Sequence, residues 1–319
     1  MKPVILYLDK ISAPMEKLAI ETFGSDIDLR FLNPNEGPKG ALKEAHYVLA
    51  TNFLVTKDVI DQAENLKMIQ RTGVGYDNVD IEYAKSKGLP VSITLGTNAS
   101  SVAELVVLYM LGLYRKIIPL DRQSKTGVWD SWKYRHESYE LLGKTIGVVG
   151  GGVIGREVMK RLAPFGVKLV YYDVKPLPAE TEKELGITYL DLENLLKASD
   201  IVTLHVPWLE ATRNMISRER IAMMKHGAVL INTARGPVVD EKAMIEALKE
   251  GRIGGAGLDV FDPEPFTPDS EILKFDNVIT TPHVGAATLD NYQRVFTFCA
   301  KNIRNAEQGK KPENVVNGL

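Results

Sequence analysis

Three charged side chains in the second half of the chain are of the types that carbonyl reduction requires. Arg235, Glu264 and His283 each follow a short apolar segment that is typical of a strand end. A guanidinium group binds a carboxylate through paired hydrogen bonds, and a histidine can give a proton to a carbonyl oxygen. A carboxylate bonded to the other ring nitrogen orients the histidine and favours its protonated form. Together the three residue types predict the chemistry of 2-oxo acid reduction.

Each of these residues taken alone also has an ordinary structural explanation. An arginine after a strand is usually a surface or helix-end residue, and a glutamate between two prolines usually lies in a solvated loop. A histidine after a proline can simply cap the next segment. Only their joint placement at strand ends, where α/β sheets bind ligands, favours a catalytic site.

A glycine-rich turn predicts a dinucleotide site in the same part of the chain. A β-branched apolar segment leads directly into Gly150-x-Gly152-x-x-Gly155 and then into a helical pattern that includes Val153 and Ile154. The first glycine permits a tight turn, the second lets the backbone approach a pyrophosphate, and the third lets the helix pack against the strand. The N–H groups at the start of the helix are available to the phosphates.

The next apolar segment, 168–172, ends at Asp173, 18 residues after Gly155. A carboxylate at this strand end accepts a hydrogen bond from a ribose 2′-hydroxyl and repels a 2′-phosphate. The pattern therefore predicts NAD as the cofactor in preference to NADP, although Lys175 adds a positive charge nearby.

Strands and helices alternate along the whole chain, which predicts parallel sheets with helices on both faces. Strands are expected at residues 4–8, 27–31, 47–50, 68–70, 91–93, 145–149, 168–172, 201–205, 229–232, 256–260 and 278–281. A helix of about 17 residues is expected to start after Asn98, with Ser100 or Ser101 as its cap and Glu104 in the capping-box position for Ser101. Further helices are expected after Asp80, after Asp240 up to Gly251, and over 289–307.

Length, charge and cysteine content narrow the class of protein. The 319 residues are enough for two domains, and the net charge of −2 argues against a nucleic acid or an anionic membrane as partner. The one cysteine, Cys299, excludes an intrachain disulfide and favours a reducing compartment. The longest apolar stretch, 105–114, is about half of what a membrane span needs, and no targeting segment is visible. A cytoplasmic location is therefore expected.

Six motifs in a fixed order resemble the D-isomer-specific 2-hydroxyacid dehydrogenase family over most of the chain. They are the segments 71–80, 98–104, 204–207 with Thr212, 231–236, 257–265 and 282–288. The resemblance implies two doubly wound parallel-sheet domains, with a Rossmann nucleotide domain inserted into a flavodoxin-like substrate domain. It places the substrate domain at 1–99, completed by 285–319, and the NAD-binding domain at 100–284.

The resemblance also assigns roles to individual residues. Arg235, Glu264 and His283 match the family's catalytic residues, and Val74 and Gly75 match the loop that holds the substrate carboxylate together with Arg235 and His283. The expected cofactor contacts are Gly150, Gly152, Val153, Ile154, Gly155, Asp173, His205, Pro207, Thr212, Thr233, Ala234, Asp259 and Gly285. No metal is expected. A homodimer joined through the nucleotide domain and the apolar helix near 102–113 is expected, with burial inside one chain as the alternative for that helix.

Several alternatives remain at this stage. The substrate is a small 2-hydroxy or 2-oxo acid, and the segment around Gly73 and Gly75 resembles the phosphoglycerate, glyoxylate and hydroxypyruvate branch. Phosphite oxidation uses a similar set of residues, and corepressors that sense dinucleotides resemble the family. Arg71, Lys133 and Arg135 could meet a substrate phosphate, although solvated surface charge is favoured for each. The loop with Trp129 and Trp132 is interpreted as a packed surface segment.

Overall fold

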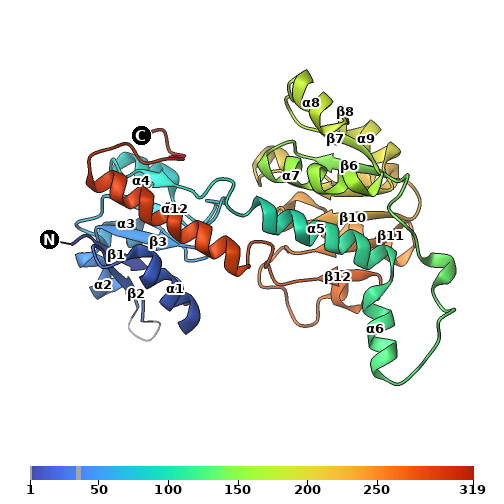
Figure 1. Ribbon diagram of the computed structural model, residues 1–319, viewed down its shortest axis with the longest axis horizontal. Helices are drawn as coiled ribbons and strands as arrows, with labels where there is room; N and C mark the ends of the chain where they lie inside the picture. Colours follow the sequence, from blue (N-terminus) through green and yellow to red (C-terminus); the bar gives the residue numbers. More distant parts are fainter. Residues whose placement is uncertain (1, 34–36) are drawn as a thin grey trace. The chain divides into compact units, whose positions relative to one another are not determined.

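The computed structural model describes residues 2–33 and 37–319, and the chain divides into two compact units (Figure 1). The split unit comprises Met1–Asn98 and Ala287–Leu319, and the continuous unit comprises Ala99–Ala286. The sheet in each unit is entirely parallel and is covered by helices on both faces. The predicted fold class is therefore confirmed.

The split unit contains a five-stranded sheet in the order β2-β1-β3-β4-β5, the order of flavodoxin-like folds. Its strands are β1 (Val4–Tyr7), β2 (Asp28–Phe31), β3 (Tyr47–Ala50), β4 (Met68–Arg71) and β5 (Val91–Ser92). Successive side chains of β1 point to opposite faces, so Tyr7 packs with α1 (Ala13–Phe23) and α12 (Leu289–Glu307). Leu6 packs on the other face, which is covered by α2 (Lys39–Glu44), α3 (Lys57–Gln62) and α4 (Ile81–Ser86).

The continuous unit contains a seven-stranded sheet in the order β12-β11-β10-β9-β6-β7-β8. Counted from β6, the first six strands follow the 3-2-1-4-5-6 order of dinucleotide-binding folds, and β12 extends the sheet. The strands are β6 (Thr145–Val149), β7 (Lys168–Tyr172), β8 (Ile187–Tyr189), β9 (Ile201–Leu204), β10 (Ala228–Asn232), β11 (Ile253–Leu258) and β12 (Val278–Thr280). One face packs against α5 (Ala99–Tyr114) and α7 (Val153–Leu162), and the other against α9 (Leu192–Ala198), α10 (Arg218–Met223) and α11 (Glu241–Lys249).

Helix ends show where local reasoning was sufficient and where it was not. Asp240 caps α11 as predicted, because its carboxylate accepts the Ala243 N–H at 3.0 Å. The predicted serine cap of α5 is wrong, since the helix already begins at Ala99. Ser100 lies inside the first turn, where its hydroxyl bonds Glu104 at 3.2 Å. Strand β8 has only three residues and was not predicted from the sequence.

The loop with Trp129 and Trp132, which lies between α6 (Ile117–Lys125) and β6, is not packed against its unit, so that interpretation is wrong. Trp129 is 93% exposed and Trp132 is 72% exposed. The guanidinium of Arg135 lies 4.0 Å from the ring centre of Trp132. Figure 1 shows why: α6 and the loop after it extend away from the sheet of the continuous unit.

The length and composition of the helices show whether any of them could span a membrane. Within residues 2–33 and 37–319, none of the helices is both long enough and apolar enough to cross a bilayer.

Candidate active site

The glycine turn after β6 forms an open cradle at the start of α7. Gly150 has φ +106°, and a Cβ atom there would lie 2.6 Å from the carbonyl oxygen of His205. A Cβ on Gly155 would lie 2.0 Å from the carbonyl oxygen of Gly150, so only glycine lets helix and turn approach this closely. At Gly152, by contrast, nothing lies within 4 Å of that position. Open space beside the helix N-terminus fits the pyrophosphate of a dinucleotide.

Asp173 lies beside this turn, where a ribose is expected. It follows β7, and its Oδ2 accepts the N–H of Gly151 at 2.7 Å. The other carboxylate oxygen can accept a further hydrogen bond. The placement fits the adenosine ribose of NAD and disfavours a 2′-phosphate.

The predicted contacts after β9 form a closed turn. The Thr212 hydroxyl accepts the Leu209 N–H at 2.8 Å and donates to the carbonyl oxygen of Pro207 at 2.8 Å. His205 Nε2 lies 2.9 Å from the hydroxyl of Thr203. Burial lowers the pKa of His205 to about 3, so this imidazole is neutral near pH 7 and cannot act as the acid.

Thr233, Ala234 and Arg235 form the loop after β10, and the loop is held by a residue that the sequence analysis missed. Asn232 is 2% exposed; its Oδ1 accepts the Ala234 N–H at 3.0 Å, and its Nδ2 donates to the Arg235 carbonyl at 2.9 Å. The buried hydroxyl of Thr233 has no partner among the described residues. An orphaned buried hydroxyl fits a polar group supplied by a bound cofactor.

The structure brings Glu264 and His283 together. His283 Nδ1 lies 2.7 Å from Oε2 of Glu264, and Oε1 of the same carboxylate accepts the Phe261 N–H at 2.9 Å. Burial acts to raise the pKa of Glu264, but these hydrogen bonds and the positive charges of His283 and Arg235 outweigh it and lower the pKa. Glu264 is therefore ionised at neutral pH and orients the imidazole.

His283 has an unusual backbone conformation that Asp259 maintains. Its φ is +53°, which is strained for a residue other than glycine. Three consecutive N–H groups all donate to Asp259: His283 to its carbonyl at 2.9 Å, Val284 to Oδ1 at 2.8 Å and Gly285 to Oδ2 at 2.7 Å. We call these contacts the Asp259 clamp. Asp259 is 2% exposed, and it fixes the backbone from which the histidine ring extends.

Arg71, in the split unit, is not a surface charge, so the interpretation favoured from the sequence is wrong. The residue is 6% exposed, and its guanidinium donates to the carbonyl oxygens of Ala50 at 2.6 Å and of Gly75 at 2.9 Å, and to that of Thr51. These contacts join the loop after β3 to the loop that contains Val74 and Gly75. Lys133 and Arg135 are exposed.

The carboxylate of Asp9, in the turn that follows β1, also holds the loop after β3. Asp9 accepts the N–H groups of Thr51 at 2.6 Å, Asn52 at 2.7 Å and Phe53 at 2.9 Å. Asn78 donates to the Phe53 carbonyl at 2.7 Å. Both loops at the carboxyl edge of this sheet are therefore anchored by buried or half-buried polar side chains.

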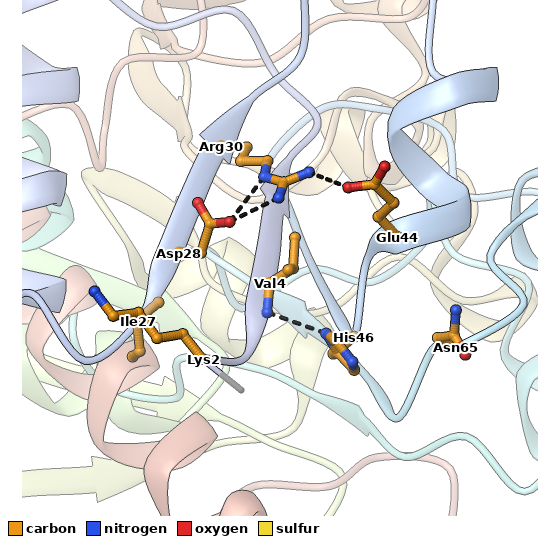
Figure 2. Close-up of a pocket in the computed structure, with 8 residues that line it drawn as sticks. All are labelled: Lys2, Val4, Ile27, Asp28, Arg30, Glu44, His46 and Asn65. Atoms are coloured by element: carbon orange, nitrogen blue, oxygen red, sulfur yellow. Dashed lines mark hydrogen bonds and ion pairs between the residues drawn. The ribbon is translucent and has the colours of Figure 1, made fainter.

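A hollow of about 700 Å³ lies at the opposite edge of the same sheet (Figure 2). It is lined near the amino ends of β1, β2 and β3, and three of its charged groups pair with one another: Arg30 bonds Asp28 at 2.7 Å and Glu44 at 2.5 Å. His46 Nδ1 accepts the Val4 N–H at 3.1 Å. Ligands of α/β sheets bind at the carboxyl ends, so this hollow is not the candidate active site.

The predicted residues thus fall into two sets. The three catalytic candidates and all the cofactor candidates belong to the continuous unit, whereas Val74 and Gly75 belong to the split unit. Over residues 2–33 and 37–319, no three His, Cys, Asp or Glu side chains are grouped so that they could hold a metal ion.

Comparison with known proteins identifies the family. The model of the D-isomer specific 2-hydroxyacid dehydrogenase NAD binding domain matches residues 107–285. Hydroxypyruvate reductase of Thermotoga maritima is 46% identical over 243 residues, which are 76% of this chain and 78% of that one. Glyoxylate reductase of Thermococcus litoralis is 40% identical over 327 aligned positions, covering 99% and 97%.

D-3-phosphoglycerate dehydrogenase of Methanocaldococcus jannaschii is 44% identical over 271 residues, 85% of this chain, but the match covers only 51% of that protein. The chain therefore spans about half the length of this relative. These relatives do not favour the phosphite-oxidising or corepressor alternatives.

Solved structures agree with this family. D-lactate dehydrogenase of Aquifex aeolicus, complexed with NAD and lactic acid, has a TM-score of 0.81 at 31% identity and 96% coverage of both chains. D-mandelate dehydrogenase of Rhodotorula graminis has a TM-score of 0.87 at 29% identity, covering 99% of this chain and 98% of the other. The resemblance read from the ordered motifs is thus confirmed, and the chain belongs to the NAD-dependent D-isomer specific 2-hydroxyacid dehydrogenases.

Proposed function

We propose that this protein reduces a small 2-oxo acid to the D-2-hydroxy acid, with Arg235, Glu264 and His283 as its catalytic residues. The observation that carries the proposal is the 2.7 Å contact between His283 Nδ1 and the ionised Glu264, on a backbone held by Asp259. Because Nδ1 is engaged by Glu264, we propose that Nε2 is the ring nitrogen that exchanges a proton with the substrate.

The chain's own groups divide the work of the reaction. NADH, when bound, supplies a hydride to the carbonyl carbon of the substrate. His283 Nε2 gives a proton to the carbonyl oxygen, and Glu264 stabilises the imidazolium before that transfer. Arg235 binds the substrate carboxylate through its planar fork and draws electron density from the carbonyl.

The cofactor-binding residues are proposed to be those of the sequence analysis, from the glycine turn and Asp173 to Thr233. The open space at Gly152, the orphaned Thr233 hydroxyl and the position of Asp173 support this assignment. We propose that the split unit is the substrate domain, with Val74 and Gly75 offering backbone N–H groups to the carboxylate.

Among the substrates of the relatives, glyoxylate and hydroxypyruvate are proposed over 3-phosphoglycerate. The guanidinium of Arg71 is committed to three backbone carbonyls and is not available for a phosphate.

A homodimer in the cytoplasm completes the proposal. Supporting observations are the exposed apolar side chains on α5, α6 and the following loop, among them Leu108, Ile117, Val128, Trp129, Trp132 and Leu142. Apolar surface of this kind is typical of an interface. The single thiol, Cys299, is buried.

The deciding experiment is turnover of His283→Ala. We expect kcat for glyoxylate or hydroxypyruvate to fall about 100- to 10,000-fold, because the proton donor is lost, while the Kd for NADH changes little. Near-normal turnover would show that another group supplies the proton. The parent enzyme, tested on a panel of 2-oxo acids, should use 3-phosphohydroxypyruvate poorly; a clear preference for the phosphorylated acid would contradict the substrate assignment.

A further inference from the structure

A tyrosine of α5 is connected by hydrogen bonds to the Asp259 clamp, which holds the backbone of His283. Tyr109 is 1% exposed, and its hydroxyl contacts the hydroxyl of Thr281. Thr281 donates in turn to Oδ1 of Asp259, the carboxylate of the clamp. Three side chains therefore connect helix α5 to the backbone on either side of His283.

The direction of the hydrogen bonds between Tyr109, Thr281 and Asp259 follows from which of these groups carries a hydrogen to donate. A carboxylate that receives the N–H groups of Val284 and Gly285 acts as an acceptor, so Thr281 uses its single hydroxyl hydrogen on Asp259. The Thr281 oxygen must then accept from Tyr109. Burial raises the pKa of Tyr109, opposed by the Thr281 hydrogen bond and reinforced by the charge of Asp259, so the phenol remains a donor at neutral pH.

Packing fixes the position of the tyrosine ring. A Cβ atom on Gly257 of β11 would lie 2.9 Å from Tyr109 Cβ and Cδ2, so the glycine makes room for the ring. One turn along α5, a Cβ on Gly112 would lie 2.9 Å from Cδ1 of Ile279 on β12. Close seating of α5 on these two strands leaves the hydroxyl little freedom.

We propose that Tyr109 is a positioning residue for the reaction, which acts through Thr281 and Asp259 to hold the strained backbone of His283 in its productive conformation. The inference rests on the proposed role of His283. In this proposal, helix α5, which lies outside the loops of the catalytic candidates, helps to set the orientation of the imidazole.

Tyr109→Phe tests the inference by removing one oxygen and keeping the ring. We expect kcat to fall about tenfold because the imidazole is displaced, and the Kd for NADH to rise by less than that, because most of the proposed cofactor contacts lie outside the Asp259 clamp. Thr281→Val should have the same effect, Thr281→Ser should restore turnover, and the double variant should be no worse than either single one. Tyr114→Phe, also buried on α5 but outside the clamp, is the matched control.

A second readout does not depend on turnover. In the cofactor-free protein, the NMR signals of the His283 ring, identified by their absence in His283→Ala, should change in chemical shift in Tyr109→Phe and stay unchanged in Tyr114→Phe. The facing charged groups, Glu264, Arg235 and Asp259, are all retained, so a shift reports geometry. Unchanged His283 ring signals together with kcat within twofold of the parent would overturn the inference, as would multiplicative effects of the two substitutions.

The two proposals fail in different ways. If His283→Ala keeps its turnover, the proposed catalytic role of His283 is wrong, and the positioning role of Tyr109 fails with it. If His283→Ala is inactive but Tyr109→Phe is normal in turnover and in its His283 ring signals, only the positioning role is wrong. In the His283→Ala background, Tyr109→Phe should have no further effect on residual turnover.

Discussion

The turns after β1 and after β6 occupy equivalent places in their sheets but differ in charge. The first contains a carboxylate, whereas the second leaves space for an anionic ligand. Each follows a central strand at which the strand order reverses. After β6, the chain has glycines and leaves an open cradle beside a helix N-terminus. After β1, it has Asp9, whose carboxylate takes up the N–H groups of Thr51, Asn52 and Phe53.

In the split unit, the carboxylate of Asp9 thus accepts three backbone N–H groups. In the continuous unit, the N–H groups at the start of α7 are left for a ligand. Both units have the same doubly wound architecture, so the architecture does not determine what binds where the strand order reverses. The residues of the turn after β1 or β6 determine it. Asp259 also accepts successive N–H groups, as Asp9 does. It is almost fully buried, and it holds the loop that contains His283.

The largest effect is expected at Gly155, where the continuous unit depends on close approach. Gly155→Val would place side-chain atoms against the Gly150 carbonyl, only 2.0 Å from the Cβ position, and should weaken NADH binding at least about 100-fold and lower the Tm. Gly152→Ala is the matched control, because nothing lies within 4 Å there: its Tm should match the parent while NADH affinity falls. Equal Tm values for both variants would mean that Gly155 is not required for packing.

Glu264→Gln should have the next largest effect, because it removes the charge that orients His283. We expect kcat to fall by about 10- to 100-fold and the alkaline limb of its pH profile to move to lower pH. The pKa of Glu264 is lowered in the folded protein, so its contribution to stability is present above the ordinary carboxyl pKa and lost as pH falls through the lowered value.

The Tm difference between parent and Glu264→Gln should accordingly shrink below about pH 4. Thermal melts from neutral to acid pH measure this. A difference that stays constant over the whole range would argue against a charged pair between Glu264 and His283.

Asp173→Ser tests how the open turn selects its nucleotide. Loss of the carboxylate should raise the ratio of kcat/KM for NADPH to that for NADH by about tenfold, since the repulsion of a 2′-phosphate is removed. The Gly151 N–H also loses its partner, so some affinity for NADH should be lost. A parent enzyme that already prefers NADPH would contradict the assignment.

Asp9→Asn should have the smallest effect, confined to the split unit. An amide offers one acceptor oxygen to three N–H groups, which costs about 1–2 kcal/mol of stability and loosens the loop after β3. KM for the 2-oxo acid should rise about threefold, while the Kd for NADH is unchanged. A change in NADH affinity instead of KM would show that this loop is not on the substrate side.

Much of this protein was predictable from local sequence. Strands and helices are marked by periodicity and caps that extend over a few residues, which is why Asp240 and α12 were placed correctly. The glycine turn and Asp173 are likewise a local pattern whose spacing predicts the dinucleotide site. The order of motifs along the chain was sufficient to predict the family.

Only the tertiary structure decided which polar groups hold the site together. Tyr109 and Thr281 are 172 residues apart, and Arg71 reaches carbonyls about 20 residues away on another strand's loop. No periodicity encodes such contacts, because they depend on how helices and strands pack. The sequence was therefore sufficient to predict the residues proposed for catalysis, whereas the tertiary structure determined which buried side chains orient them.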